Sequence, residues 1–498
     1  MESQIKVLPQ NKIISCKVGE SLLEVLAKSG FFIPAFCGGQ GNCGKCKVKI
    51  IEGKIKGATV DRDGYVLSCK AIINGNLTVL LNEEQGSGLD FFNYEQIVSL
   101  EDGLGIALDL GTTTLAACLV DLKSGKILSK TSSLNPQAAY GADVLTRIKA
   151  CTEGKLTILH SLIIEETNEI IDKLSCNKQI STLVVCANTT MLHIFANENP
   201  KTIGSYPFTP VFKDAREYFG RDLNINAKKV RLLPSASAYI GSDITAGITA
   251  LNLNNLDGVN LLIDVGTNGE IVLTKKGEVF ATSTAAGPAF EGACIECGIG
   301  GVEGAISKVI IKDNNIQFSV IGNIEPQGIC GSGLIDLISL LLSEGLIDES
   351  GTFDECANSP LISNLKGDKF YLTDDIYLSQ KDVRQYQLAK AAICAGIEAL
   401  LIECNIDKSE VENAYIAGGL GYYMNVENAF KTEVLPNWLK GKTRTVGNSG
   451  LAGAVYCMLS DKKFDEIVKI AKNTKIIELS FSKIFQELYV ENMMFKSN

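Results

Sequence analysis

The 498-residue chain has few histidines, no surplus of positive charge and no long apolar run, and each shortage excludes a class of function. Its only two histidines, His160 and His193, argue against histidine-based metal sites and catalytic triads, so we expect both to be structural. The net charge of -10 argues against a nucleic-acid partner, because neutralising phosphates requires Lys and Arg in excess. The most apolar helical run, 334–342, is interrupted by Asp336 and Ser339 and is far shorter than the ~20 residues that span a membrane.

The chain also opens without a basic segment followed by an apolar stretch, so no signal peptide is recognisable. We therefore expect a cytoplasmic protein. In a reducing compartment its 16 cysteines are expected to serve as metal ligands and free core thiols rather than as disulfides. The length suits about three domains of roughly 100 to 200 residues each.

The N-terminal residues 1–82 predict a small β-rich domain with one helix. Residues 5–8 and 12–18 form strand-like runs around a Pro-Gln-Asn turn, which indicates a hairpin. Residues 22–27 have their apolar positions at the spacing of a short amphipathic helix. Residues 83–102 then lose hydrophobic periodicity and predict a linker.

Four cysteines of this first domain have the spacing of a metal site. They are Cys37, Cys43, Cys46 and Cys69, three in a glycine-rich loop and the fourth after a later strand. Four thiolates complete the tetrahedral shells of two irons, and plant-type 2Fe-2S proteins use a similar spacing with a first gap one residue shorter. A structural Zn site and free thiols remain alternatives, although Zn sites more usually show two tight pairs.

Two segments have the form of phosphate-binding hairpins, in which a strand ends in Asp and a Gly-Thr turn leads into a second strand. They are Asp109-Leu-Gly-Thr-Thr-Thr and Asp264-Val-Gly-Thr-Asn-Gly. Glycine lets phosphate approach the backbone, N–H and hydroxyl groups donate to it, and the carboxylate holds Mg through water. We therefore predict Asp109 and Asp264 as the catalytic organisers. The predicted nucleotide contacts in these turns are Gly111, Thr112, Thr113, Gly266, Thr267 and Asn268.

Two later glycine turns are further candidates for nucleotide contact. An apolar strand from Tyr415 leads into Gly418 and Gly419, which would suit the adenosine side of a cleft. Gly331 and Ser332 precede the apolar run 334–342, where a helix N-terminus could meet an anion. A packed glycine turn is an equal alternative for this second motif.

Together the hairpins resemble the actin-like ATPase and sugar-kinase superfamily, and the first domain resembles β-grasp ferredoxins. The resemblance implies an α+β ferredoxin domain followed by an α/β actin-like ATPase with two ribonuclease-H-like halves, residues 103–255 and 256–498. It also implies one-electron transfer by a 2Fe-2S cluster on Cys37, Cys43, Cys46 and Cys69, and binding of ATP with Mg.

Longer strings are similar to one family within this superfamily, the ATP-dependent reductive activators of corrinoid proteins. The strings are Gly141–Ile148, Ala187–His193, Ala285–Ala293, Gly328–Asp336 and Gly447–Ala454. Membership would imply ATP-driven reduction of Co(II) to Co(I) in a cobalamin-bearing partner protein. It would also imply an upstream low-potential electron donor and a homodimer. Longer members carry an additional domain between ferredoxin and ATPase, whereas here the linker leads almost directly into the first phosphate hairpin.

Two other functions fit parts of the chain. A small-molecule kinase with a regulatory ferredoxin would need a carboxylate base, for which Glu291 and Asp143 are candidates. An ATP-gated, actin-like binding protein would leave the cluster without a role. Cys294 and Cys297 form an isolated pair, which we expect to be structural thiols.

The cysteine spacing makes a prediction about metal content. Anaerobically purified protein should contain iron and sulfide in equal amounts and give an EPR signal after one-electron reduction. Cys43→Ser should destabilise the cluster but retain nucleotide binding, because a linker separates the two modules. Zinc without sulfide would contradict the cluster assignment.

Overall fold

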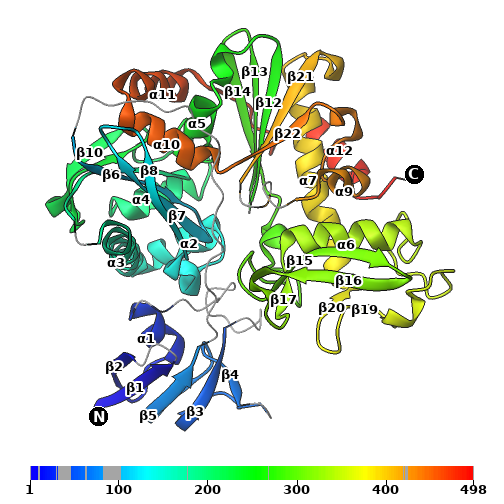
Figure 1. Cartoon of the computed structure of the whole chain (residues 1–498), viewed down its shortest axis with the longest axis horizontal. Helices are drawn as coiled ribbons and strands as arrows, with labels where there is room; N and C mark the ends of the chain where they lie inside the picture. Colours follow the sequence, from blue (N-terminus) through cyan, green and yellow to red (C-terminus); the bar gives the residue numbers. More distant parts are fainter. Residues whose placement is uncertain are drawn as a thin grey trace.

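The computed structural model describes residues 2–8, 12–29, 31, 46–61, 64–81, 102–176, 178–266, 268–418, 420 and 424–496. An N-terminal β-grasp domain lies below two larger α/β halves, each built on a six-stranded sheet (Figure 1). This arrangement confirms the predicted fold class. Among the described residues, none of the helices combines the length and the hydropathy that crossing a bilayer requires.

The N-terminal domain is a five-stranded mixed sheet with the order β2-β1-β5-β3-β4 and one helix. The predicted hairpin and helix are both confirmed, and β1 pairs in parallel with β5. Ile5, Leu22 and Leu26 are fully buried between the sheet and the helix. The elements are β1 (Glu2–Leu8), β2 (Lys12–Lys17), α1 (Leu22–Lys28), β3 (Lys47–Lys56), β4 (Tyr65–Leu67) and β5 (Ile72–Leu80).

The first ATPase half is a sheet with the order β10-β11-β9-β6-β7-β8. Its strands are β6 (Leu104–Leu110), β7 (Thr114–Asp121), β8 (Ile127–Leu134), β9 (Ile180–Ala187), β10 (Arg216–Phe219) and β11 (Ala227–Leu232). Its main helical segments are the 3-10 turn η1 (Pro136–Tyr140), α2 (Val144–Ala150), α3 (Leu156–Ser175), α4 (Thr189–Phe195) and α5 (Ser242–Ala250).

The second half has a sheet with the order β22-β21-β12-β13-β14-β23 and two small three-stranded sheets. The large sheet contains β12 (Val259–Val265), β13 (Gly269–Lys275), β14 (Glu278–Thr284), β21 (Val411–Ala417), β22 (Thr443–Gly447) and β23 (Lys475–Ile476). The small sheets contain β15 (Ala305–Lys312), β16 (Asn315–Val320), β17 (Gly328–Ile329), β18 (Leu365–Lys366), β19 (Lys369–Tyr371) and β20 (Tyr377–Ser379). The helical segments are the 3-10 turn η6 (Pro288–Glu291), α6 (Gly331–Ser343), α7 (Gln380–Glu403), α9 (Val426–Lys431), α10 (Ser449–Leu459), α11 (Asp461–Asn473) and α12 (Lys483–Glu491).

The two large sheets repeat one topology, as the sequence predicted. In the first, β8, β7 and β6 form an antiparallel meander, and β6 pairs in parallel with β9. In the second, β14, β13 and β12 form the same meander, and β12 pairs in parallel with β21. The two hairpins β6-β7 and β12-β13 therefore occupy equivalent places in the two halves.

The helices α5 and α10 join the halves, because each packs on the sheet of the other half. Apolar side chains of α10, such as Leu451 and Val455, pack on the sheet of the first half, whereas Ile244 and Ile248 of α5 pack on the sheet of the second. The two helices also pack against each other. A Cβ added to Gly453 would lie 2.1 Å from the carbonyl oxygen of Ala246, so only glycine permits this close approach.

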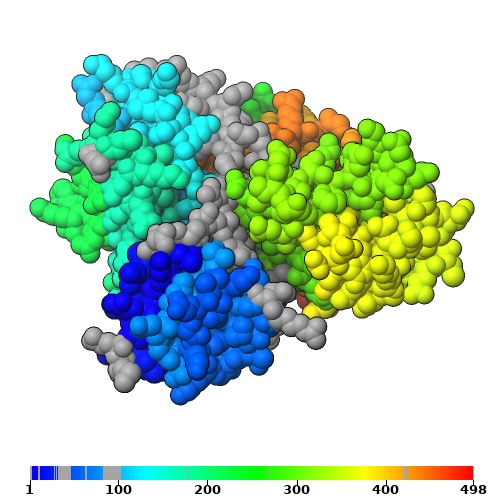
Figure 2. Space-filling view, turned by 60° about the horizontal axis from the view of Figure 1, so that its bottom comes forward, coloured from blue at the N-terminus to red at the C-terminus, as the bar shows by residue number. Residues whose placement is uncertain are grey.

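The ferredoxin-like domain lies against the first ATPase half (Figure 2). Its helix α1 contacts the turn η1. Burial and, to a smaller extent, the charge of Glu24 on α1 raise the pKa of Tyr140 in that turn to about 12. The N-terminal domain is therefore packed on the half that contains the first predicted phosphate hairpin.

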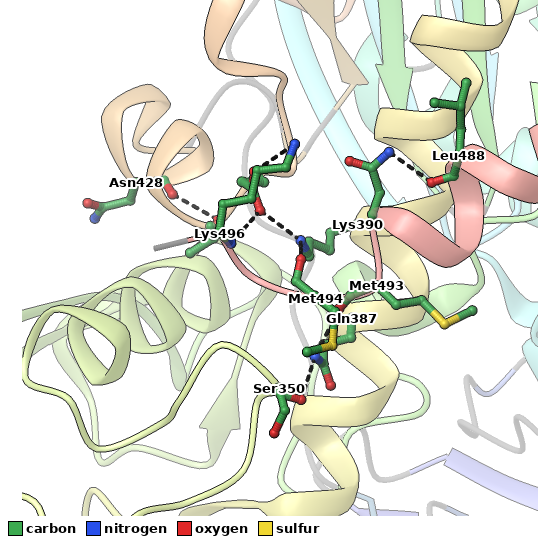
Figure 3. Close-up of polar contacts among 11 residues, drawn as sticks. Ser350, Gln387, Lys390, Asn428, Leu488, Met493, Met494 and Lys496 are labelled. Carbon is green, nitrogen blue, oxygen red and sulfur yellow. Dashed lines mark hydrogen bonds and ion pairs between the residues drawn. The ribbon is translucent and has the colours of Figure 1, made fainter. Parts of the chain in front are cut away.

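The C-terminal residues pack across α7 (Figure 3). Lys390 on α7 is fully buried, and its ammonium group donates to Glu433 Oε2 at 3.1 Å and to the carbonyl oxygen of Met494 at 2.6 Å. It also lies 4.8 Å from the ring centroid of Phe495. Burial lowers the pKa of Lys390, and the neighbouring carboxylate of Glu433 opposes that change.

Both histidines are structural, as predicted. Nδ1–H of His193 donates to the carbonyl oxygen of Thr189 at 2.7 Å, and its Nε2 accepts from the N–H of Val211 at 3.0 Å. Nδ1–H of His160 donates to the carbonyl oxygen of Ile194 at 3.1 Å. Desolvation by burial lowers both pKa values, which favours the neutral rings.

The buried ion pair predicts a large loss of stability when its cation is removed. Lys390→Met leaves the buried carboxylate of Glu433 with only Lys496, whose backbone N–H donates at 3.1 Å and whose ammonium group lies 3.5 Å away, so the unfolding free energy should fall by about 3 kcal/mol. The control Lys440→Met breaks an exposed pair with Glu427 and should cost at most about 1 kcal/mol. Urea unfolding followed by the fluorescence of the single tryptophan, Trp438, measures both. Equal losses would contradict this account of the pair.

Candidate functional site

The two predicted phosphate hairpins line one cavity between the ATPase halves. Most of the predicted nucleotide-site residues meet there, whereas Thr267 and Gly419 lie outside the described residues. The predicted residues that line it are Asp109, Gly111, Thr112, Thr113, Asp264, Gly266, Asn268, Gly331, Ser332 and Gly418.

The first hairpin is tightly closed by its backbone. The N–H of Gly111 donates to the carbonyl oxygen of Thr114 at 3.1 Å, and a Cβ on Gly111 would lie only 2.5 Å from that oxygen. Asn188, at the N-terminus of α4, donates its side-chain N–H to Thr112 Oγ1 at 3.0 Å. Asn448, at the N-terminus of α10, donates to Asp109 Oδ2 at 2.7 Å. Side chains from distant elements therefore orient both the turn and its carboxylate.

The second hairpin meets the glycine turn after β21. The N–H of Gly266 donates to the carbonyl oxygen of Asn268 at 3.0 Å. Gly418 has a φ of +86°, and a Cβ there would lie 2.5 Å from Asp264 Oδ1. Glycine is therefore required at 418 for close approach to a carboxylate, which is a reason that the sequence did not provide.

Three further carboxylates, those of Asp243, Glu270 and Glu291, line the cavity with Asp109 and Asp264. The pKa is raised to about 6 for Asp109, to about 7 for Asp264 and to about 8 for Asp243, and that of Glu270 is raised well above its ordinary value. Desolvation by burial is the main cause in all four. For all but Asp109, the charges of neighbouring carboxylates contribute to the raised pKa.

The two carboxylates considered as general bases have different surroundings. Glu291 ends η6 in the second half, and its Oε2 accepts from Thr113 Oγ1 of the first half at 3.0 Å. Asp143 instead caps the N-terminus of α2, where its side chain accepts from the N–H of Thr146 at 2.8 Å. Glu291 therefore lies in the cleft, whereas Asp143 has a local capping role.

At the α6 N-terminus, Gly331 and Ser332 line the cavity but are also tightly packed. A Cβ on Gly331 would lie 2.1 Å from the carbonyl oxygen of Phe290. The hydroxyl of Ser332 donates to the carbonyl oxygen of Ser307 at 2.8 Å. Packing thus explains why these two residues are Gly and Ser. The groups left to bind an anion are the backbone N–H groups at the helix N-terminus.

Two of the four predicted cluster ligands are described, and they lie together. The sulfur atoms of Cys46 and Cys69 are 3.2 Å apart, with Cys46 buried just before β3 and Cys69 partly exposed just before β5. Cys37 and Cys43 lie outside the described residues. The described thiol pair fits one edge of a four-thiolate site. Cys294 and Cys297 were predicted as structural thiols. Cys294 is exposed, and Cys297 is partly buried with its thiol donating to the carbonyl oxygen of Asp375 at 3.7 Å.

Sequence reasoning missed Asp243 and Glu270 as cavity carboxylates and gave no role to Asn188 and Asn448. Asn188 and Asn448 stand inside strings that carried the family resemblance, so a signal existed for them. Glu270 directly follows the turn of the second hairpin. Strand alternation alone does not tell which face of the sheet its side chain lies on. Asp243 had no local signal, because only the packing of α5 brings it to the cleft.

Comparison with known families covers almost the whole chain. Residues 5–74 match the 2Fe-2S iron-sulfur cluster binding domain, residues 104–256 the RACo middle region, and residues 258–498 the C-terminal domain of RACo, the ASKHA domain.

Individual relatives agree with these matches. The chain is 38% identical over 420 residues to the corrinoid activation enzyme RamQ of Eubacterium limosum, covering 79% of this chain and 70% of the relative. It is 28% identical to a [Co(II) methylated amine-specific corrinoid protein] reductase of Methanosarcina barkeri, covering 78% and 76%. A solved structure of a reductive activator for corrinoid,iron-sulfur protein aligns with a TM-score of 0.73 at 28% identity, covering 99% of this chain and 98% of that one.

The raised carboxyl pKa values predict how stability depends on pH. Between about pH 5 and 8 the folded, metal-free protein holds protons that its unfolded chain, with Asp pKa ~3.9, has already lost. Its unfolding free energy should therefore fall as pH rises through the folded pKa values of about 6 to 8.

Urea titrations across this range, in chelator and without nucleotide, test the prediction. Asp264→Asn should flatten the slope because it removes one of the buried acids. Asp313→Asn is the control, since Asp313 is an exposed turn residue with a φ of 50°, which Asn also tolerates. A slope of opposite sign, or one that Asp264→Asn leaves unchanged, would contradict the assignment of this pH dependence to the cavity carboxyl groups.

Proposed function

The chain belongs to the family of reductive activators of corrinoid proteins, and on this basis we propose how its parts divide the work. A 2Fe-2S cluster on Cys37, Cys43, Cys46 and Cys69 donates one electron to the Co(II) of a corrinoid protein, forming Co(I). ATP bound between the two hairpins supplies the free energy. The observation that carries this proposal is the shared cavity: two phosphate-type hairpins and five carboxylates meet in one cleft, and the ferredoxin-like domain packs on the half that contains one hairpin.

The cavity fits a hydrated Mg ion rather than a fully protein-ligated one. Among the described residues, no three His, Cys, Asp or Glu side chains are placed to hold a metal together. Asp109 and Asp264 lie on opposite hairpins of the same cavity, so water ligands would have to bridge the gaps. Bound Mg would neutralise the charge of the phosphates. Asp109 and Asp264 would orient its water shell, while Thr112, Thr113 and Asn268 would contact the phosphates.

We assign the activation of the hydrolytic water to Glu291. Its carboxylate lines the cavity, comes from the half opposite the first phosphate hairpin, and accepts from Thr113 Oγ1. A carboxylate in this place can hold a water for attack and accept its proton. The contact between Thr113 and Glu291 also joins the two halves, so hydrolysis would depend on how closely the cleft is shut.

ATP is required because the electron moves uphill. Each 100 mV of unfavourable potential costs ~2.3 kcal/mol per electron, and a plant-type cluster lies near about -400 mV. Nucleotide can supply this energy only if the ATP and ADP states bind the corrinoid partner with different affinity. We therefore propose coupling through docking and not through phosphorylation of the cofactor, which also separates this chain from the small-molecule kinases that share its fold.

Two partners complete the proposal. An upstream low-potential donor must reduce the cluster again after each transfer. A second copy of the chain forms the homodimer that the family resemblance implies. Exposed apolar side chains on and near α12 support such a contact, with Phe481, Val490 and Met494 exposed by 68%, 65% and 47%.

Glu291→Gln tests the proposal with two readouts. In an anaerobic mixture of ATP, reductant and a Co(II) corrinoid protein, phosphate release and Co(I) absorbance should both fall by roughly 100-fold or more. The cluster should still be reducible, and Asp143→Asn, which keeps a good helix cap, should behave as wild type. Unchanged phosphate release would reject Glu291 as the base. Lost hydrolysis with normal Co(I) formation would reject ATP as the driving force.

A further inference from the structure

Arg147 is a fully buried cation directly behind the first phosphate hairpin. It belongs to the string Gly141–Ile148, in which Asp143 caps a helix and the proposed chemistry uses no residue. Its guanidinium donates to the carbonyl oxygen of Thr112, to the carbonyl oxygen of Gly141 at 3.1 Å, to Gln137 Oε1 at 3.1 Å and to Met191 Sδ at 3.2 Å. All four acceptors are neutral, and within the described part of the chain no ion pair includes Arg147.

Arg147 and Asn135 together hold every carbonyl group of the turn. The side chain of Asn135 donates to the carbonyl oxygen of Gly111 at 2.9 Å, and its backbone N–H donates to that of Thr113 at 2.8 Å. Arg147 holds the remaining one, that of Thr112. Arg147 itself does not line the cavity, so the carbonyl group of Thr112 is drawn to the side away from the nucleotide.

The planar peptide bond turns this anchoring into an anion site. In a trans peptide the N–H points opposite to the carbonyl that precedes it, so fixing the Gly111 and Thr112 carbonyls directs the N–H groups of Thr112 and Thr113 the other way. Neither N–H has an acceptor among the residues that the structure describes. Two free amide donors at the cavity, with a buried positive charge behind them, favour a phosphate group.

The position of Arg147 is itself fixed from a neighbouring element. Gln137 is fully buried in η1, and its side-chain N–H donates to the carbonyl oxygen of Leu159 at 2.8 Å, which leaves Oε1 directed at Arg147. The N–H of Gln137 in turn donates to the side chain of Asn135 at 3.0 Å. Asn135, Gln137 and Arg147 thus form one hydrogen-bonded support under the turn.

We infer that Arg147 is a positioning residue of the nucleotide site, which orients the Thr112–Thr113 peptide toward a phosphate group and supplies the buried charge that this group faces. The inference deepens the proposed function and rests on it, because it takes the ligand of the cavity to be ATP. It differs from a purely structural role in one respect. A structural arginine would affect all ligands alike, whereas Arg147 acts only on the phosphate part of the nucleotide.

Calorimetric binding of adenosine, ADP and ATP to the full-length protein tests the inference. Arg147→Gln should weaken ATP binding by tenfold or more and ADP binding less or equally, and should leave adenosine binding unchanged. Arg147→Lys, which keeps the charge without the planar fork, should recover part of the loss. The control Lys149→Gln removes a charge from the same helix, but that side chain is 62% exposed, so no change is expected.

The outcomes separate this inference from the proposed function. If wild type binds no ATP, the proposed function fails. If wild type binds ATP and Arg147→Gln weakens all three ligands equally, or none, the inference alone fails. Should Arg147→Gln not fold, as judged by its circular dichroism and the EPR signal of the reduced cluster, Gln137→Met takes its place. That variant removes the hydrogen bond from Gln137 to Arg147 but keeps the charge of Arg147. It must weaken ATP binding by less than is expected for Arg147→Gln, and it must leave adenosine binding unchanged.

Discussion

Five carboxylates gathered in one cavity are the constraint on which the cleft depends. Asp109 and Asp243 come from the first half, and Asp264, Glu270 and Glu291 from the second. No lysine or arginine is among the described residues that line this cavity, so cations supplied from outside would favour the joint ionisation of these acids. Ionisation without them would push the two halves apart. The helices α5 and α10 join the halves, so we propose that Mg bound with the nucleotide would offset this negative charge and favour closure.

The ferredoxin-like domain lies where closure of the cleft could affect its position. Helix α1 lies on η1, the turn that contains Gln137, and Gln137 supports Arg147 behind the first phosphate hairpin. The ferredoxin-like domain is thus one layer of side chains away from the groups that would hold ATP. This contact gives the proposed coupling a short physical route.

The parts of the site that were predictable from sequence are those in which the chemistry is local. A strand, an Asp and a Gly-Thr turn occur within six residues, so both hairpins could be recognised before their meeting was known. Asp243 and Arg147 could not be assigned, because only the packing of α5 and α2 brings them to the cleft. The run 334–342 predicted a helix that in fact begins at Gly331. Glycine fits at 331 and 333 because a Cβ there would meet the carbonyl oxygens of Phe290 and Ile306. Which sheet α5 and α10 pack on was likewise open, because periodicity gives a helix face but not its partner.

The central claim is that ATP raises the electron above the level that the cluster reaches at equilibrium. It is tested most directly by fixing the solution potential with a redox buffer and measuring the ratio of Co(I) to Co(II) in the corrinoid protein by its visible absorbance. With this protein and ATP, the ratio should exceed the value that the potential sets, by tenfold for each 1.4 kcal/mol transferred, and should return to that value when ATP is exhausted. The same ratio with ATP and with ADP would show that nucleotide changes only the rate, and would contradict the account.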